Sequence, residues 1–164
     1  MAIDVRVARP DEYTEAGRVT ASAYREFVRG ADWDEYLERI ADVAQRAERT
    51  TILVAVEDDA ILGSLTLELD GRVRNDEDQR PLDPDEAHVR MLGVDPAARR
   101  RGVARRLMLA AEAAALTAGR ARLTLNTTPR MRWARQMYGS LGYRRLEDRV
   151  LDGGFVLLSY EKAL

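Results

Sequence analysis

The 164-residue sequence contains no cysteine and a single histidine, His88. The lack of cysteine excludes disulfides, a thiolate nucleophile and cysteine-ligated metal. One histidine is too few for a histidine-rich metal site. We therefore expect no metal centre in this protein.

Long apolar runs are also lacking. No stretch approaches the roughly 20 apolar residues that a membrane-spanning helix needs, and residues 1–6 have no signal-peptide pattern. We therefore expect a cytoplasmic protein with no membrane segment. The length fits one domain over residues 1–164, large enough to bury a core.

Neither sign of charge dominates, since 26 Lys and Arg residues stand against 28 Asp and Glu residues. Lys162 is the lone lysine, and the arginines are concentrated in residues 99–106 and 130–145. A slightly negative chain with local basic clusters favours a local phosphate site over nucleic-acid binding. No nucleic-acid partner is expected.

Within residues 87–108, the pattern of apolar residues changes from that of a strand to that of a helix. Strand-forming residues end at Asp95-Pro96, and apolar residues return at helical spacing from Val103. The loop between them contains Arg99, Arg100, Arg101 and Gly102. Free backbone N–H groups, a positive helix end and guanidinium groups together predict a phosphate or pyrophosphate site. The fingerprints GxGxxG and GxxxxGK[ST] are absent, which disfavours a dinucleotide fold and a P-loop.

The spacing of apolar residues, alternating in strands and every three to four residues in helices, also predicts the other strands and helices. Strands are expected at residues 3–7, 51–56, 61–69, 122–126, 143–151 and 155–162, and helices at 11–28, 33–47, 102–118 and after Pro129. The helix at 33–47 should turn inward Leu37, Ile40, Ala41 and Ala44. Residues 71–86 lack periodicity and hold six acids against three arginines. Such a long loop is often disordered or borders a site, where its acidity would favour a cationic amine.

Two segments resemble one family. Arg99-x-x-Gly102-x-Ala104 is similar to the [QR]-x-x-G-x-[GA] acyl-CoA motif of the GCN5-related N-acetyltransferase (GNAT) superfamily. Residues 123–126, followed by Ala134-Arg-Gln-Met-Tyr138-Gly-Ser-Leu-Gly-Tyr143, resemble the strand, helix and turn that close the same fold. The resemblance implies an α+β fold with a twisted mixed sheet of about seven strands and helices on both faces.

It also implies an acyl-CoA-dependent N-acyltransferase that moves acetyl from acetyl-CoA to a primary amine by direct attack. The acceptor would be a small molecule or a peptide, and no metal is needed. A bulge in the fourth strand would free backbone groups for the pantetheine arm, carried over onto Leu92, Gly93 and Val94. The motif residues that would hold the pyrophosphate are Arg99, Arg100, Arg101, Gly102, Val103, Ala104 and Arg105.

Two side chains match catalytic positions of the family. Tyr138 matches the tyrosine that many members use as general acid toward the thiolate. His88 stands where some members place a glutamate base, and an unperturbed imidazole titrates near neutral pH. Glu68 or a water relay are the alternatives for the base. Aromatic candidates for acceptor contacts, for which ordinary core or cap packing is the favoured explanation, are Tyr24, Phe27, Trp33 and Tyr36.

Two positions depart from the family pattern. Members that acetylate protein N-termini often carry a glutamate and an asparagine where this chain has Asn126 and Met131. That acceptor class is therefore not assigned. A non-catalytic acyl-CoA-binding regulatory module on the same fold is the alternative function, and a homodimer is left open.

Overall fold

The computed structural model describes residues 2–28, 30, 32–71 and 81–164. Most of the loop expected at 71–86 thus lies outside the described residues. The chain forms two compact units, residues 1–67 with 91–111 and residues 68–90 with 112–164. Among the described residues, no helix combines the length and apolarity needed to cross a bilayer.

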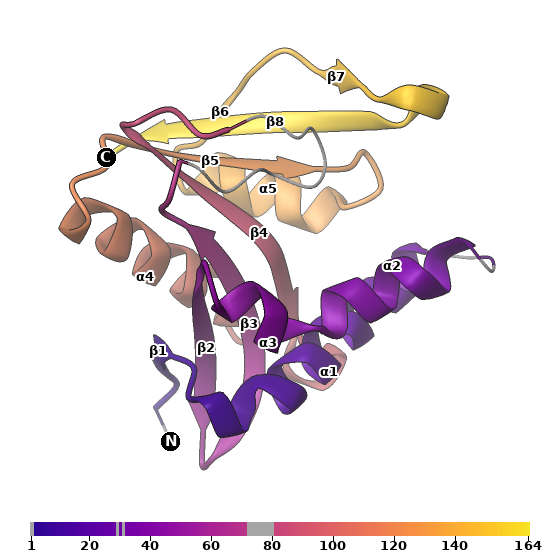
Figure 1. Ribbon diagram of the computed structural model, residues 1–164, viewed down its shortest axis with the longest axis vertical. Helices are drawn as coiled ribbons and strands as arrows, with labels where there is room; N and C mark the ends of the chain where they lie inside the picture. The colour runs from indigo at the N-terminus through magenta and orange to yellow at the C-terminus, as the bar shows by residue number, and fades with distance from the viewer. Residues whose placement is uncertain (1, 29, 31, 72–80) are drawn as a thin grey trace. The chain divides into compact units, whose positions relative to one another are not determined.

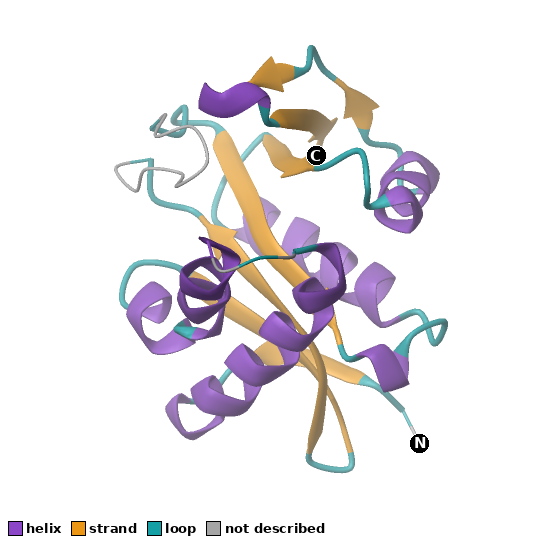
Figure 2. Cartoon of the chain, turned by 90° about the vertical axis from the view of Figure 1, so that its right-hand side faces the viewer, coloured by secondary structure: helices purple, strands orange, loops and turns teal. Residues whose placement is uncertain are grey.

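The first unit contains an antiparallel part of the sheet. Its strands β1 (Asp4–Val7), β2 (Thr51–Glu57) and β3 (Ala60–Glu68) follow one another, and β4 (Glu86–Val94) comes next. A short turn joins β2 to β3 (Figures 1 and 2). Its residues Asp58 and Asp59 have φ +49° and +64°, the left-handed pair that two-residue hairpins favour. The expected hairpin is confirmed. Val7, however, is 58% exposed, because β1 pairs only with β2 among the described residues and lies at the sheet edge.

The helical region of this unit differs from the sequence prediction. A 3-10 turn (Pro10–Glu12), α1 (Tyr13–Tyr24) and a second 3-10 turn (Arg25–Phe27) replace the single helix expected at 11–28. The helix expected at 33–47 is divided into α2 (Asp32–Ala41) and α3 (Val43–Ala47). Asp42 interrupts it at φ −80° and ψ 69°, and its side chain caps α3 by accepting from the Gln45 N–H. The break changes the inward face, so that Ala44 is exposed while Val43 and Arg46 are buried.

Arg46 explains how the break is tolerated. Its guanidinium donates to the carbonyls of Arg39 at 2.6 Å, Ile40 at 2.8 Å and Asp42 at 3.3 Å. The last carbonyls of any helix lack partners within the helix. A buried arginine therefore closes the C-terminal end of α2, a role that no local pattern in the sequence indicates.

The second unit contains the parallel pairing. β4 pairs with β5 (Arg122–Thr127) from Glu86↔Arg122 to Val89↔Leu125. β5 pairs antiparallel with β8 (Val156–Ala163), and two short strands, β6 (Arg144–Arg145) and β7 (Arg149–Val150), pair with β8 as well. The strand expected at 143–151 is thus split, because residues 146–148 leave the ladder. The chain folds as α+β with a mixed sheet, as expected, with eight strands in the described residues.

Two helices complete the expected pattern. α4 (Val103–Thr117) is followed by Gly119 at φ +76°, the left-handed residue that commonly ends a helix. α5 (Arg132–Ser140) belongs to the second unit and lies beside β8 (Figure 1). Its buried side chains include Ala134 and Tyr138. The predicted helices at 102–118 and after Pro129 are confirmed.

Candidate active site

The loop before α4 has the backbone that an anion site needs. Arg100 and Gly102 are both left-handed, at φ +63° and +76°. The first α-helical bond runs from the Arg106 N–H to the Gly102 carbonyl at 3.1 Å, so the N–H groups of residues 103–105 precede it and have no carbonyl within the helix. A Cβ built on Gly102 meets nothing within 4 Å. The loop therefore presents open space beside a positive helix end, which fits a phosphate.

The arginine side chains of this loop do not all face that space. Arg101 donates to both carboxylate oxygens of Glu57 at 2.7 Å. This hydrogen bond raises the pKa of Arg101 and lowers the pKa of Glu57. Arg99 pairs with Glu26, whereas Arg100 is exposed. No local pattern in the sequence indicates either glutamate, because they are 44 and 73 residues away from their arginines.

β4 has an irregular backbone, as the bulge implied by the family resemblance requires, but the irregular residue is Met91 and not Gly93. Met91 has φ +52°, a left-handed value that is uncommon for a residue with a side chain. The register between β4 and β5 ends at Val89↔Leu125, although both strands continue. The backbone of Leu92, Gly93 and Val94 therefore follows an irregularity at Met91 within β4.

Gly93 has a structural reason to be glycine that the sequence did not indicate. A Cβ there would lie 3.0 Å from Cα of Thr20 and 3.2 Å from Cβ of Ala23, both on α1. Close packing against α1 therefore requires a glycine here, independently of the role at the pantetheine arm that the family resemblance implies for residues 92–94.

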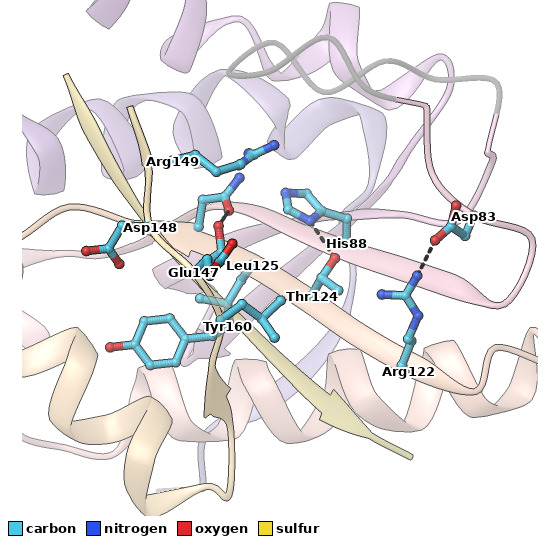
Figure 3. A pocket seen from close by; sticks show the side chains of 12 residues that line it. Asp83, His88, Arg122, Thr124, Leu125, Glu147, Asp148, Arg149 and Tyr160 are labelled. Carbon is cyan, nitrogen blue, oxygen red and sulfur yellow. Dashed lines mark hydrogen bonds and ion pairs between the residues drawn. The ribbon is translucent and has the colours of Figure 1, made fainter. Parts of the chain in front are cut away.

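The second unit contains a cavity of about 560 Å³. His88 on β4 and Thr124 on β5 lie on its wall, and residues 146–148, which leave the ladder, line another side together with Arg149 of β7 (Figure 3). Asn126 and Tyr160 contribute to the lining as well. The cavity is thus formed at the point where the strand expected at 143–151 is interrupted.

His88 is connected to a buried carboxylate through one hydroxyl. Its Nδ1 lies 2.8 Å from Oγ1 of Thr124, and that hydroxyl donates to Oε1 of Glu86 at 2.6 Å. The Asp83 N–H and the Arg122 guanidinium donate to the other oxygen of Glu86, at 3.1 and 3.3 Å. His88 is 2% exposed and Glu86 is fully buried. His88 was predicted from the sequence, whereas Glu86 and Thr124 match no motif and are recognised only in the structure.

The exposed charges at this cavity are mostly acidic. Asp83, Glu147 and Asp148 line it, together with Arg122 and Arg149. Arg122 donates to Asp83 at 2.5 Å and also approaches Asp85 and Glu161, so its charge is offset locally. Asp83 is paired with Arg122 and Asp148 with Arg145, so these charges largely offset one another and the lining has no strong preference for either sign of charge.

Tyr138 lies in an aromatic cluster and not on the cavity wall. Its ring centroid is 5.9 Å from that of Tyr143 and 5.8 Å from that of Tyr160. Burial raises the pKa of Tyr138 above the ordinary value of a phenol. Of the three rings, Tyr160 lines the cavity. Of the two predicted catalytic side chains, His88 therefore lines the cavity and Tyr138 does not. Tyr160 contacts Tyr138 and also lines the cavity.

The alternative base, Glu68, is fully buried and paired. Nε of Arg90 lies 2.7 Å from its Oε1. A carboxylate that balances a buried guanidinium cannot accept a proton without leaving that guanidinium uncompensated. This favours His88 over Glu68 as the base.

The aromatic side chains proposed for the acceptor lie in the first unit and are partly buried. Trp33 and Tyr36 pack edge to face at 5.6 Å, and Arg39 lies 5.6 Å from the centroid of Tyr36. These contacts fit the packing alternative. In the part of the chain that the structure describes, no cluster of three His, Asp or Glu side chains is arranged to hold a metal ion.

Both the sequence and the fold of this chain are similar to those of known acetyltransferases. The sequence profile of the Acetyltransferase (GNAT) domain matches residues 11–164. The PaiA N-acetyltransferase of Thermoplasma acidophilum, solved with coenzyme A, superposes with a TM-score of 0.76 at 15% identity over 100% of both chains. YncA of Salmonella typhimurium, a putative acetyltransferase solved with acetyl-CoA, has a TM-score of 0.70 at 16% identity over 99% of this chain and 94% of that one. No curated protein matches the sequence significantly.

Proposed function

The chain belongs to the acetyltransferase (GNAT) family, and we propose that it transfers an acetyl group from acetyl-CoA to a primary amine by direct attack. The observation that carries the proposal is the loop before α4, in which Arg100 and Gly102 are left-handed beside open space. This loop is the segment that matches the acyl-CoA motif. Acetyl-CoA would supply the activated acyl group.

The first unit would bind the acyl donor. The backbone N–H groups of residues 102–105 and the side chains of Arg100 and Arg105 would hold the pyrophosphate. The backbone of residues 92–94, after the irregularity at Met91, would bind the pantetheine arm. Arg99 and Arg101 would have to leave their glutamate partners to reach a phosphate, and exposed ion pairs of this kind contribute little stability.

The second unit would bind the amine and remove its proton. An unperturbed alkylamine is about 0.1% neutral at pH 7, which corresponds to roughly 4 kcal/mol of unfavourable deprotonation. His88, on the wall of the cavity, would take that proton. The amine nitrogen would then form the C–N bond while the C–S bond breaks. The second proton of the nitrogen would leave with the thiolate, so that a free thiol results.

Tyr138 would assist the leaving group as a hydrogen-bond donor. Because burial raises the pKa of Tyr138, its hydroxyl stays protonated at neutral pH. For the same reason, complete transfer to a thiolate, whose conjugate acid has a pKa near 8.5, is uphill by about 2 kcal/mol or more. A hydrogen bond to the developing charge requires no such transfer.

Tyr138→Phe should lower kcat by about tenfold, the effect of losing one hydrogen bond to a charged group. Fold and acetyl-CoA affinity should persist, because the ring remains. The raised pKa of Tyr138 also predicts that kcat shows no alkaline loss from this group up to about pH 10. Tyr143→Phe, in the same cluster, is the control, because the Tyr143 hydroxyl donates to Glu112 instead. Equal rates for wild type and both variants would leave Tyr138 with a packing role only.

Calorimetric titration with CoA and acetyl-CoA tests the donor site. Gly102→Glu should weaken binding of both by about tenfold or more, since it adds a charged side chain beside the phosphates. Gly119→Glu is the matched control, because Gly119 has the same φ of +76° and the same open surroundings. The proposal fails if wild type binds neither ligand at millimolar concentration, or if both variants weaken binding equally.

Turnover decides between the enzyme and the non-catalytic module. Release of free thiol from acetyl-CoA in the presence of an amine panel should exceed the rate without protein. Binding without any thiol release would support the regulatory module.

A further inference from the structure

We propose that Glu86 and Thr124 are positioning residues that hold His88 in the tautomer with its proton on Nδ1 and its lone pair on Nε2. The inference rests on the proposed role of His88 as the base. It concerns two side chains that the family resemblance did not indicate.

The tautomer follows from counting protons. A threonine hydroxyl has one proton, and an ionised carboxylate has none to donate. At 2.6 Å from Oε1 of Glu86, the Thr124 proton is committed to the carboxylate. The contact of 2.8 Å between Oγ1 and Nδ1 of His88 is then a hydrogen bond only if Nδ1 carries a proton.

The carboxylate is held by donors on its other side. Oε2 of Glu86 accepts from the Asp83 backbone at 3.1 Å and from Arg122 at 3.3 Å. A fully buried carboxylate with three donors around it is satisfied as an anion. It is therefore an acceptor for Thr124 and not a competing donor.

Strand register explains why these groups meet. In the parallel ladder His88 lies opposite Thr124, and Glu86 lies opposite Arg122. Alternate residues of a strand share one face, so residues 86 and 88 of β4 and residues 122 and 124 of β5 form a square on one side of the sheet. The hydrogen-bond chain is thus built into the backbone pairing.

This arrangement suits a base. The imidazole nitrogen that does not contact Thr124 is turned away from it (Figure 3), and His88 lies on the cavity wall. When Nε2 takes a proton, Nδ1 keeps its bond to Thr124, and the negative charge of Glu86 offsets the new positive charge. The charged groups that line the cavity with His88 are Arg122 on β5, Arg149 on β7 and, from the loops, Asp83, Glu147 and Asp148; Tyr160 on β8 is titratable. Arg90 follows on the same face of β4 and is paired with Glu68 of β3.

The single histidine makes the tautomer directly measurable. In protein labelled with ¹⁵N-histidine, every imidazole signal belongs to His88. At a pH where the ring is neutral, we expect the proton on Nδ1. Thr124→Val keeps the shape of the side chain and removes the hydroxyl, so the Nδ1–H form should lose its predominance and kcat/KM should fall about tenfold or more. Thr124→Ser retains the hydroxyl and should preserve both.

Glu86→Gln gives an independent reading. Its amide oxygen still accepts from Thr124, so the tautomer should persist, but the midpoint of the His88 titration should move to lower pH because a negative charge is lost. The proposal is overturned if wild-type His88 carries its proton on Nε2, or if Thr124→Val changes neither the tautomer nor the rate. The NMR readings need no substrate, so they remain valid even if no amine is acetylated and the proposed function fails.

Discussion

Replacing His88 with glutamine is expected to lower kcat/KM for amine acetylation by about 10²-fold at neutral pH, the lower end of what a general base contributes. Glutamine cannot accept a proton in this pH range, whereas the amine is almost entirely an ammonium ion. The affinity for acetyl-CoA should be unchanged, since His88 belongs to the second unit and the acyl-CoA motif to the first. Steady-state rates of thiol release and calorimetry with CoA measure the two quantities.

The pH profile distinguishes the base from a structural histidine. For wild type, kcat/KM should fall as the pH drops through the range in which an imidazole becomes charged, because the protonated ring has no lone pair to offer. His88→Gln should lack this acidic limb. If the variant retains the limb at the same pH, the base is Glu68 or a water chain.

Gly17→Ala is expected to reduce the free energy of unfolding by about 3 kcal/mol or more, beyond the usual range for overpacking. A Cβ on Gly17 would lie 2.0 Å from the carbonyl oxygen of Ala41 and 2.9 Å from its carbon. Both are backbone atoms and cannot rotate away. α1 and α2 would have to separate, which would also disturb the carbonyls that Arg46 closes.

Thermal and urea unfolding measure this effect. For a chain of this size, 3 kcal/mol corresponds to a fall in Tm of roughly 6–12 °C. The matched control is Gly139→Ala in α5, where a Cβ meets nothing within 4 Å. Alanine is the better helix former by about 1 kcal/mol, so the control should be as stable as wild type or more stable. Similar Tm values for both variants would contradict the packing of α1 on α2.

Several features were predictable from local sequence because their causes are local. The β2–β3 hairpin follows from alternating residues around Asp58 and Asp59, and the end of α4 follows from Gly119. The motif from Arg99 to Ala104 predicted the family, which the profile match over residues 11–164 bears out. The roles of the individual motif residues remain predictions, as does the single domain.

The split of the helix expected at 33–47 was beyond local reasoning. Apolar spacing continues across Asp42, so periodicity alone predicts one helix. What decides the break is Arg46, whose guanidinium reaches the backbone of α2 and also Oγ1 of Thr66, 20 residues further along. A tertiary contact of this kind overrides local periodicity.

The sequence by itself determined the fold class, the order of most elements and the position of the arginine-rich loop before α4, because periodicity, turn residues and the Arg-rich motif all act over a few residues. Only the tertiary structure decided the left-handed backbone at Met91, the partner of Arg101 and the hydrogen-bond chain from Glu86 through Thr124 to His88. Strand pairing places Thr124 beside His88 from 36 residues away. Hydrogen bonds depend on distances of a few tenths of an ångström, which no spacing along the chain can specify.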